Sequence, residues 1–279
     1  MGKLDGRVAV VTGGARGLGR EYCLAMAKEG ADIAIFDICQ NLKTIPYPMS
    51  TMEQMNKTVK EIQNLGRKAL GIKCDVRKAE DLEAAYTKTI KELGKVDILV
   101  ANAGVLSMAP TWELKEEVWD ETMDVMLKGV WLTTKYITPH MIKRRSGSMI
   151  LVSSVCGIKG YENLVHYNVA KFGVRGVMMT LAKELAPHNI RVNCIAPSTA
   201  WTDLVHNEAT FAAFNLKWDP KKEKELHEEY NKIWNTFHLL QIGSYEAHLA
   251  APSVVFLASD DSSCLTGHTL PIDGGLLAR

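Results

Sequence analysis

The sequence lacks several features that would assign it to other classes of protein. No apolar run is long enough to span a bilayer, and the N-terminal MGKLDGRVAVV has no signal-peptide pattern. Basic and acidic residues number 33 and 32, so the net charge of +1 predicts neither nucleic acid nor an anionic membrane as a partner. The six cysteines are scattered without a CxxC pair, which argues against a disulfide framework or a metal site. We therefore expect a reduced, cytoplasmic protein.

What the sequence does contain is a regular alternation of apolar, β-branched runs with helix-length segments. The runs do not alternate polar and apolar residues, which is typical of strands buried on both faces. The pattern predicts an α/β fold, a Rossmann-type doubly wound parallel sheet of about seven strands in a three-layer αβα sandwich. No repeat or linker divides residues 1–279, so we expect one domain. The runs are VAVVTG, ADIAIFD, KALGIKCD, VDILVANAG, SMILVSS, IRVNCIAP and HTLPID.

A glycine-rich turn follows the first of these runs. In TGGARGLG, Gly13, Gly17 and Gly19 precede a helical pattern, whose N-terminal amides and dipole suit a pyrophosphate. The spacing is GxxxGxG, which an ordinary strand–helix turn also shows. Asp37 closes the second run, where a carboxylate accepts hydrogen bonds from ribose hydroxyls and repels a 2′-phosphate. The two features together predict NAD binding, although Arg16 in the turn could hold a 2′-phosphate and favours NADP.

Tyr167 and Lys171 form a candidate proton-transfer pair in the run YNVAK. They lie four residues apart, so on a helix both side chains leave the same face. A free tyrosine has a pKa near about 10 and is a poor base at neutral pH. An ammonium group within reach would lower that pKa and tune the phenol for acid–base work. An ordinary helix surface shows the same spacing.

The order and spacing of these motifs resemble the short-chain dehydrogenase/reductase family (SDR) over essentially the whole chain. The matching residues are TGGARGLG at 12–19, NAG at 102–104, Ser154, YNVAK at 167–171 and TGHTLPIDGG at 266–275. The resemblance implies that Ser154 holds the substrate oxygen, that Tyr167 exchanges a proton with it, and that Lys171 binds the nicotinamide ribose. The adjacent Ser153 is expected to point the other way on its strand.

Two segments exceed the minimal alternation and resemble the carveol dehydrogenase-like, mycofactocin-associated subfamily. They are the insert near 41–53, with PYP inside it, and the lid segment near 203–242, with NEATF inside it. Long excursions of this kind are often functional. The resemblance implies a tightly held NAD covered by the insert and a terpenoid- or steroid-like secondary alcohol or ketone. It also implies an external redox carrier that re-oxidises bound NADH, and a homotetramer or dimer built partly on the helix that carries Tyr167.

Two sets of residues are predicted for these ligands. Asp75 is placed for the adenine amino group, and the Asn102–Gly104 run for close approach of the ribose. The alternative for the substrate residues is that they only pack the lid against the sheet. The full cofactor set is Gly13, Arg16, Gly17, Leu18, Gly19, Asp37, Ile38, Asp75, Val76, Asn102, Ala103, Gly104, Tyr167, Lys171, Pro197 and Thr202. The substrate set is Ser154, Cys156, Tyr161, Tyr167 and Trp201.

Two departures from the family pattern keep alternatives open. Met126 stands in DVML where the family has the asparagine of DVNL, which helps to hold a water that links the lysine to solvent; a thioether cannot donate a hydrogen bond. Ser198 stands in IAPST where the family often has glycine. The leading hypothesis is an NAD-dependent alcohol dehydrogenase or ketone reductase. The alternatives are an NADPH-dependent carbonyl reductase, and a catalytically weak NAD-binding sensor or scaffold that only Met126 favours.

Overall fold

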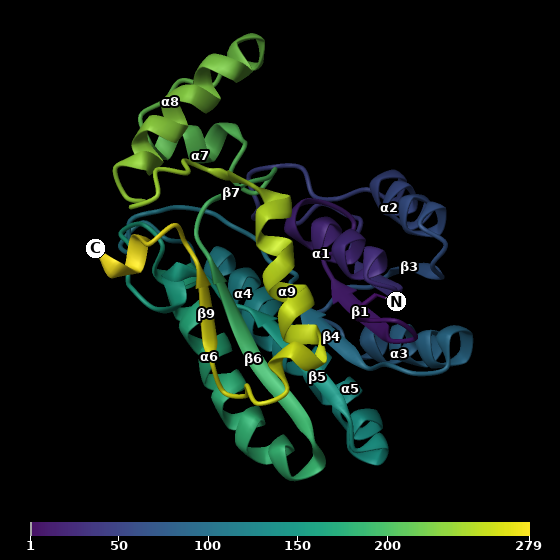
Figure 1. Cartoon of the computed structure of the whole chain (residues 1–279). Coiled ribbons are helices and arrows are strands. Elements are labelled where there is room, and N and C mark those ends of the chain that lie inside the picture. Colours follow the sequence, from purple (N-terminus) through teal and green to yellow (C-terminus); the bar gives the residue numbers. More distant parts are fainter. Residues whose placement is uncertain (1) are drawn as a thin grey trace.

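A seven-stranded parallel sheet forms the centre of the protein (Figure 1). The computed structural model describes residues 2–279. All neighbouring strands in the sheet run parallel, and each of the seven apolar runs of the sequence supplies one strand. In spatial order the strands are β3 (Ala69–Lys73), β2 (Asp32–Asp37), β1 (Val8–Thr12), β4 (Ile98–Ala101), β5 (Gly147–Val152), β6 (Ile190–Pro197) and β9 (Thr269–Ile272).

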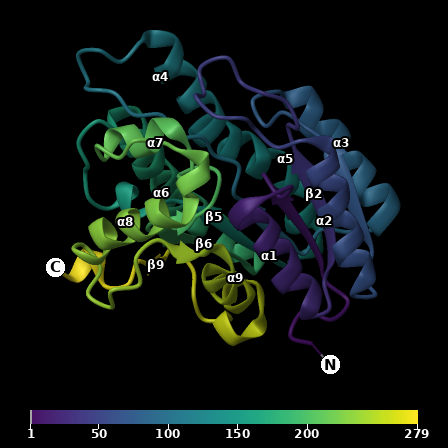
Figure 2. The same cartoon turned by 90° about the horizontal axis from the view of Figure 1, so that it is seen from above.

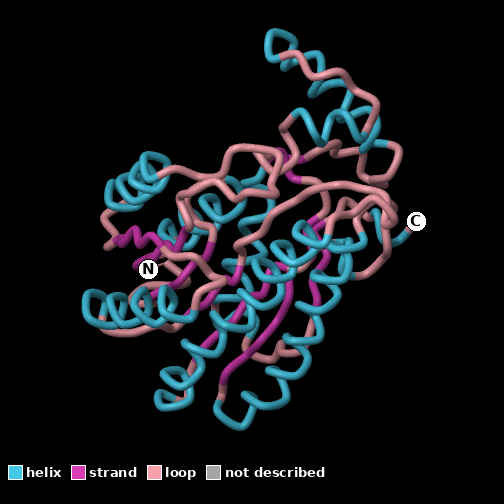
Figure 3. The backbone as a smooth tube through the Cα atoms, turned by 180° about the vertical axis from the view of Figure 1, so that it is seen from behind, coloured by secondary structure: helices cyan, strands magenta, loops and turns pink. Residues whose placement is uncertain are grey.

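Helices cover both faces of this sheet because successive strand residues point to opposite sides. Val10 packs into one apolar core and Val11 into the other. The first face carries α3 (Ala79–Leu93), α5 (Gly129–Arg144) and α6 (Val165–Leu185), and the second carries α1 (Gly17–Lys28), α2 (Met52–Asn64) and α9 (Ala251–Ala258). The view from behind shows the helical layer that Figure 1 partly hides (Figure 3). The predicted three-layer αβα sandwich is confirmed.

The strand order changes direction at β1, which lies between β2 and β4. The connections therefore leave β1 and β4 toward opposite sides of the sheet, and a crevice opens at the carboxyl ends of these strands. Ligands bind at this switch point in open α/β sheets. The glycine-rich turn after β1 and the NAG run after β4 both end there.

The insert follows β2 and leads into α2. Residues 38–51 form a loop without regular secondary structure, and α2 begins at Met52. Thr51 caps this helix: its hydroxyl accepts from the Gln54 backbone N–H at 3.2 Å, and the Gln54 side chain accepts from the Thr51 N–H at 3.0 Å. This capping box fixes where the loop ends and the helix starts.

The lid stands above the carboxyl ends of the strands as a separate layer (Figure 1). It contains α7 (Glu208–Ala213) and α8 (Glu223–Asn235). Two short strands that pair with each other flank it, β7 (Ala200–Trp201) before it and β8 (Tyr245–Glu246) after it. Phe211, Leu226 and Tyr230 form a small apolar core of its own. Seen from above, α7 and α8 lie on the side of α6, away from α2 and α3 (Figure 2).

One further segment matters for the site. α4 (Glu116–Met123) continues through a π-helical turn, Asp124–Lys128, into α5. Such turns are frequent at functional sites, because they re-aim side chains within a helix. Within residues 2–279, no helix has the length and apolar character needed to cross a bilayer.

Candidate active site

A groove runs along the carboxyl edge of the sheet, beneath the insert and the start of the lid. Every residue of the predicted cofactor set borders it, and so does Ser154. These residues are spread over more than half of the sequence, and the fold brings them together in one groove. Their binding roles remain predictions.

The glycine-rich turn is shaped by two contacts that leave no room for side chains. Gly13 has φ +66°, and a Cβ there would lie 2.9 Å from the Ala103 Cα. A Cβ on Gly19 would lie 2.1 Å from the Gly13 carbonyl oxygen. The Asn102 side chain braces the turn, since its amide donates to the Thr12 carbonyl at 3.0 Å and to the Gly13 carbonyl at 3.1 Å. The backbone at the start of α1 is thus open to a ligand and held in place from β4.

Asp37 lies at the end of β2 and is only 5% exposed. One carboxylate oxygen accepts from the Ala15 backbone N–H at 3.0 Å, and the other accepts from the Cys39 backbone N–H at 3.2 Å and from the Ser50 hydroxyl. Each oxygen has more than one lone pair, so further donors can still bind. The contacts hold a fixed negative charge at one end of the groove and tie the insert to it.

Arg16 does not point freely into the groove. Its guanidinium donates to the Pro48 carbonyl at 2.6 Å and pairs with the Asp203 carboxylate at 2.8 Å. Pro48 belongs to the insert and Asp203 to the start of the lid. Arg16 therefore joins the two segments that overhang the groove, and its charge is already matched.

Ser154, Tyr167 and Lys171 meet at the other end of the groove. Tyr167 and Lys171 lie on the first turns of α6, and Ser154 follows β5. The Ser154 hydroxyl lies 3.3 Å from the Pro197 carbonyl, and Lys171 Nζ donates to the Val152 carbonyl at 2.9 Å. Lys171 Nζ is 5.6 Å from the centroid of the Tyr167 ring.

The electrostatics of this pair differ from the expectation. Burial raises the pKa of Tyr167 well above its usual value, the neighbouring Cys156 thiol acts in the same direction, and the Ser154 hydroxyl opposes them. Burial also lowers the pKa of Lys171 to about 8. Burial thus acts against the predicted lowering of the tyrosine pKa by the ammonium, and the two groups are not in hydrogen-bonding contact.

Met126 is fully buried within the π-helical turn and borders the groove. A Cβ built on Gly104 would lie 3.6 Å from the Met126 sulfur and 3.8 Å from Lys171 Nζ. The thioether and the lysine thus both lie next to Gly104, and Met126 stands where the family pattern has an amide. A sulfur is a weak acceptor and donates nothing.

Comparison with known proteins agrees with this geometry. The profile of a family described as short chain dehydrogenase matches residues 7–212. The (-)-trans-carveol dehydrogenase of Rhodococcus erythropolis is 38% identical over 277 residues, 99% of each chain. The chain belongs to the short-chain dehydrogenase/reductase family.

Solved structures of SDR proteins show the same architecture. The crystal structure of carveol dehydrogenase from Mycobacterium avium in complex with NAD aligns with a TM-score of 0.95 at 38% identity, covering 100% of both chains. The structure of a short chain dehydrogenase from Mycobacterium paratuberculosis bound to NAD aligns with a TM-score of 0.87 at 31% identity, again over 100% of both chains. The resemblance inferred from the motifs is confirmed, and the chain is an oxidoreductase of this family.

The structure separates three of the predicted substrate residues from the groove of this SDR enzyme. Trp201 stacks on His227 with ring centroids 3.7 Å apart and packs into the lid. Cys156 and Tyr161 lie beside the reacting end without lining the groove. The Tyr161 hydroxyl is buried without a hydrogen-bond partner among the described residues. For Trp201 the alternative that it packs the lid agrees with the observed contacts. Aromatic identity alone could not distinguish packing from lining.

Several groove residues were not predicted from the sequence. They come from the carboxyl ends of strands and the residues that follow them, from the insert, from the π-helical turn and from the start of the lid, and the only sequence signal was the position of the insert directly after Asp37. They are Phe36, Leu42, Tyr47, Met49, Ser50, Cys74, Val105, Val125, Met126, Val152, Ser153, Ser198, Ala200, Asp203, Leu204 and Val205. Ser153, expected to point away, donates its hydroxyl to the Lys171 carbonyl at 2.9 Å and so supports α6.

A second cavity of about 310 Å³ lies between the insert, the segment after β4 and the lid. Most of its lining is apolar, including Leu106, Met108 and Val118. Leu106 also connects it to the groove, because its backbone N–H donates to the hydroxyl of Tyr47, a groove residue, at 3.0 Å. Neither cavity contains a metal-ligating cluster, since none occurs among residues 2–279.

Proposed function

We propose that this SDR enzyme interconverts a hydrophobic secondary alcohol and its ketone with NAD as cofactor and Tyr167 as general acid and base. One observation carries the proposal: Ser154, Tyr167 and Lys171 border the same groove as the glycine-rich turn and Asp37. A dinucleotide with its adenosine ribose at Asp37 and its pyrophosphate on the turn would bring its nicotinamide to the three residues. Relatives whose structures contain NAD share the whole fold.

The residues of the chain account for the proton in this reaction. The bound nicotinamide would exchange a hydride with the substrate carbon. Ser154 would hold the substrate oxygen, and Tyr167 would take the hydroxyl proton during oxidation or give it during reduction. Because burial raises the pKa of Tyr167, the phenol is the ground state near neutral pH. Reduction uses that phenol directly, whereas oxidation needs the phenolate and is favoured at higher pH.

The electrostatics at the adenosine end support NAD over NADP. A 2′-phosphate would have to lie beside the buried Asp37 carboxylate, whose charge has no cationic partner in its hydrogen bonds. Arg16, the one residue that favoured NADP, is already paired with Asp203 and bonded to Pro48. We therefore disfavour the NADPH-dependent carbonyl reductase.

The second cavity supports an apolar substrate. Leu106, Met108 and Val118 present aliphatic surface. The polar part of the lining comes from Thr44, Ser107, Glu113, Lys115, Asn207 and Thr210. Its volume of about 310 Å³ lies at the low end of typical small-molecule pockets, and it adjoins the groove through Leu106. A terpenoid- or steroid-like alcohol, with its carbinol at Tyr167 and its ring body in this cavity, fits these features.

The two overhanging segments support slow exchange of the cofactor. Ser50 and Tyr47 of the insert border the groove, as do Asp203 and Leu204 of the lid. A ligand beneath a cover leaves only when the cover opens, which lowers its off-rate. An NADH retained in this way would be re-oxidised in place, and an external redox carrier would serve that purpose.

Exposed apolar side chains support the expected homotetramer or dimer. On α6, Phe172 is 44% and Met179 is 54% exposed, and Trp131 on α5 is 48% exposed. Large apolar residues grouped on neighbouring helices are typical of protein–protein interfaces. Sedimentation velocity of the wild type and of Phe172→Glu tests this, and an unchanged monomer in both would contradict it.

The function is tested by Tyr167→Phe. Turnover of a panel of secondary alcohols is measured with added NAD and, separately, with an artificial electron acceptor that re-oxidises bound NADH. Positioned acid–base groups contribute roughly 10²–10⁴-fold to rates, so a loss of that size is expected. The matched control is Tyr86→Phe, whose ring packs against His140 outside the groove. Turnover retained in Tyr167→Phe would refute the assignment.

A further inference from the structure

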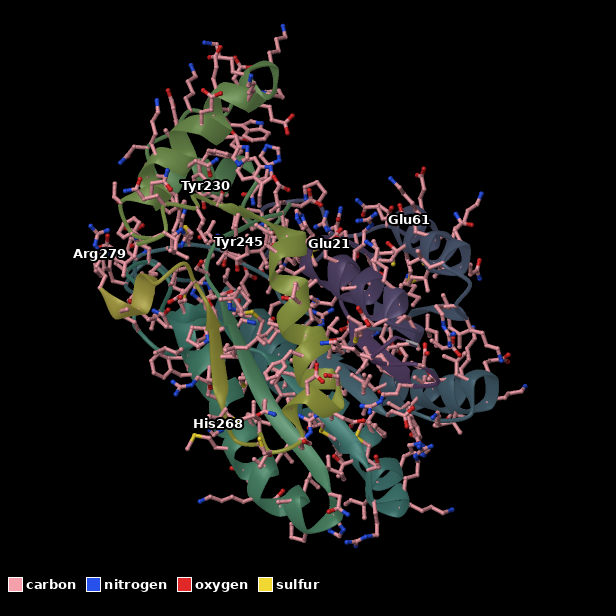
Figure 4. The ribbon with its side chains drawn as sticks, in the orientation of Figure 1. Glu21, Glu61, Tyr230, Tyr245, His268 and Arg279 are labelled. Carbon is pink, nitrogen blue, oxygen red and sulfur yellow. The ribbon has the colours of Figure 1, made fainter. Side chains whose placement is uncertain are left out.

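Ser198 occupies the reacting end of the groove in the place of a family glycine. It follows Pro197, whose carbonyl lies 3.3 Å from the Ser154 hydroxyl, and it borders the groove. Its backbone N–H donates to the Ile272 carbonyl at 3.0 Å, and the Tyr245 hydroxyl donates to the same carbonyl at 3.0 Å. The backbone of Ser198 is thereby fixed to β9 at the base of the lid, where Figure 4 labels Tyr245.

The Ser198 hydroxyl has a buried imidazole as its partner. His238 Nε2 lies 3.0 Å from Ser198 Oγ, and His238 is only 1% exposed. Burial lowers the pKa of His238, so the ring is neutral near pH 7. Its Nδ1 has no hydrogen-bond partner among the described residues. A neutral imidazole carries one N–H, so its tautomer decides whether Ser198 donates to it or accepts from it.

The Ser198–His238 bond is not needed to hold the lid. The segment after α8 is already attached through Leu240, whose N–H donates to the Gly274 carbonyl at 3.0 Å. The return strand is attached through Tyr245, whose N–H donates to the Thr199 carbonyl at 3.1 Å. These backbone bonds fix the same stretch of chain. The side-chain pair instead fixes the orientation of the hydroxyl of a residue that borders the groove.

We propose that Ser198, oriented by His238, hydrogen-bonds the carboxamide of the nicotinamide and fixes the rotation of that ring. The inference rests on the proposed NAD-dependent function. Ser154 and Tyr167 are assigned to the substrate oxygen, whereas Ser198 borders the same groove next to Pro197 and carries a hydroxyl to which the proposed mechanism gives no role. A carboxamide offers both a carbonyl acceptor and N–H donors, so it complements Ser198 in either tautomer of His238. Ser198 and His238 are thus positioning residues for the cofactor.

Cofactor analogues test this without reference to catalysis. In the 3-acetylpyridine analogue of NADH the amide N–H₂ is replaced by methyl, and in the thionicotinamide analogue the carbonyl oxygen is replaced by sulfur. Binding of NADH and of both analogues is measured by calorimetry on cofactor-stripped protein. Wild type is expected to bind one analogue roughly 2- to 12-fold more weakly than NADH, the range for one hydrogen bond. Which analogue loses affinity reports the tautomer of His238.

Variants separate this role from a structural one. Ser198→Ala is expected to bind NADH and that analogue with similar affinity. Ser198→Thr is expected to keep the wild-type preference for NADH over the analogue, and His238→Phe is expected to lose this preference. Ser244→Ala is the matched control, because Ser244 Oγ also lies near an imidazole of the lid, His227 Nε2 at 3.3 Å, but does not line the groove. It is expected to keep the wild-type preference, and melting temperatures verify that each variant folds.

The outcomes are distinct. A preference that persists in Ser198→Ala, or a loss of affinity that is equal for all three ligands, would overturn the inference. So would a Ser198→Ala variant whose only change is a higher KM for the alcohol, since the hydroxyl would then serve the substrate. Wild type that binds no NADH at all would instead overturn the proposed function.

Discussion

Replacing Lys171 by methionine is expected to stabilise the cofactor-free protein while abolishing turnover. Lys171 is 4% exposed and its ammonium donates one hydrogen bond, to the Val152 carbonyl. Its charge therefore has lost most of its hydration with little compensation. Methionine has a similar length, fills the same space and carries no charge.

The magnitude follows from the pKa of Lys171, which burial lowers from 10.5 to about 8. That difference corresponds to about 3 kcal/mol by which burial of the charged form weakens folding. Leaving the Val152 carbonyl without its donor costs about 1–3 kcal/mol in return. We expect a net gain of about 1 kcal/mol near pH 7, or about 2–4 °C in melting temperature for a chain of this size.

The pH dependence gives the sharper test. Between pH 8 and 10.5 the unfolded chain binds more protons at Lys171 than the folded chain does, so the wild type gains stability as pH rises through this window. The advantage of Lys171→Met should therefore be greatest below pH 8 and shrink toward pH 10. Calorimetric melts of stripped protein at pH 7, 8, 9 and 10 measure it.

The control is Lys183→Met, an exposed lysine on the same helix, which should not change the melting temperature appreciably. If the difference between Lys171→Met and the wild type stays constant from pH 7 to 10, the buried ammonium is not its cause. A Lys171→Met protein that is less stable than the wild type at every pH would show that the hydrogen bond to Val152 outweighs burial of the charge.

Three further predictions concern the groove. Asp203→Asn breaks the partly exposed ion pair with Arg16 and should speed NADH dissociation, measured by stopped flow, about 1.5- to 5-fold. The control is Asp124→Asn, which breaks a similarly exposed ion pair with Lys128 and should leave the dissociation rate unchanged. Asp37→Asn keeps an acceptor but removes the charge, so the ratio of NADP to NAD affinity should rise; an unchanged ratio would mean that shape excludes the 2′-phosphate. Met126→Asn should raise turnover if proton transfer is rate-limiting. The solvent isotope effect on turnover should then be larger in the wild type than in the variant. Equal rates and equal isotope effects in the two proteins would mean that the proton reaches solvent by a route that does not involve position 126.

The fold and the cofactor groove were predictable because both depend on local pattern. Continuous apolar runs specify buried strands, and parallel strands bring their carboxyl ends to one edge. Gly13, Asp37, Asn102 and Lys171, far apart in sequence, each lie at such an end or on the helix beside it. Once the strand order is known, their meeting at one groove follows from topology without any knowledge of side-chain contacts.

The rest depends on contacts that no local pattern encodes. Trp201 lies between two groove residues, Ala200 and Thr202, yet its ring stacks on His227 of α8. The raised pKa of Tyr167 depends on its burial in the folded protein, which residue spacing does not report. Arg16 has the chemistry to bind a phosphate, and only the folded positions of Pro48 and Asp203 show that its donors are already used.

The anchoring of the insert differs from that of the lid in a way that bears on the order of ligand release. Thr44 of the insert donates to the Glu121 carboxylate from its N–H at 3.0 Å and from its hydroxyl at 2.6 Å. Glu121 in turn pairs with Arg77 at 2.6 Å, and Arg77 pairs with Asp75 at 2.7 Å. The insert is thus attached to the adenosine end of the groove by a network of charge-assisted bonds, which are stronger than neutral ones.

The lid, by contrast, has one ion pair toward the insert, Arg16–Asp203, in which Asp203 is half-exposed, and its Val205 packs in the same apolar cluster as Tyr47 of the insert. Exposed pairs contribute about 0–1 kcal/mol, so opening the lid costs mainly this apolar packing, while the charged network around Glu121 stays intact. Opening the lid alone would uncover the reacting end and the second cavity, but the adenosine half would stay beneath the insert. The alcohol and ketone should therefore exchange in every cycle, while NAD outlasts many turnovers on the same molecule.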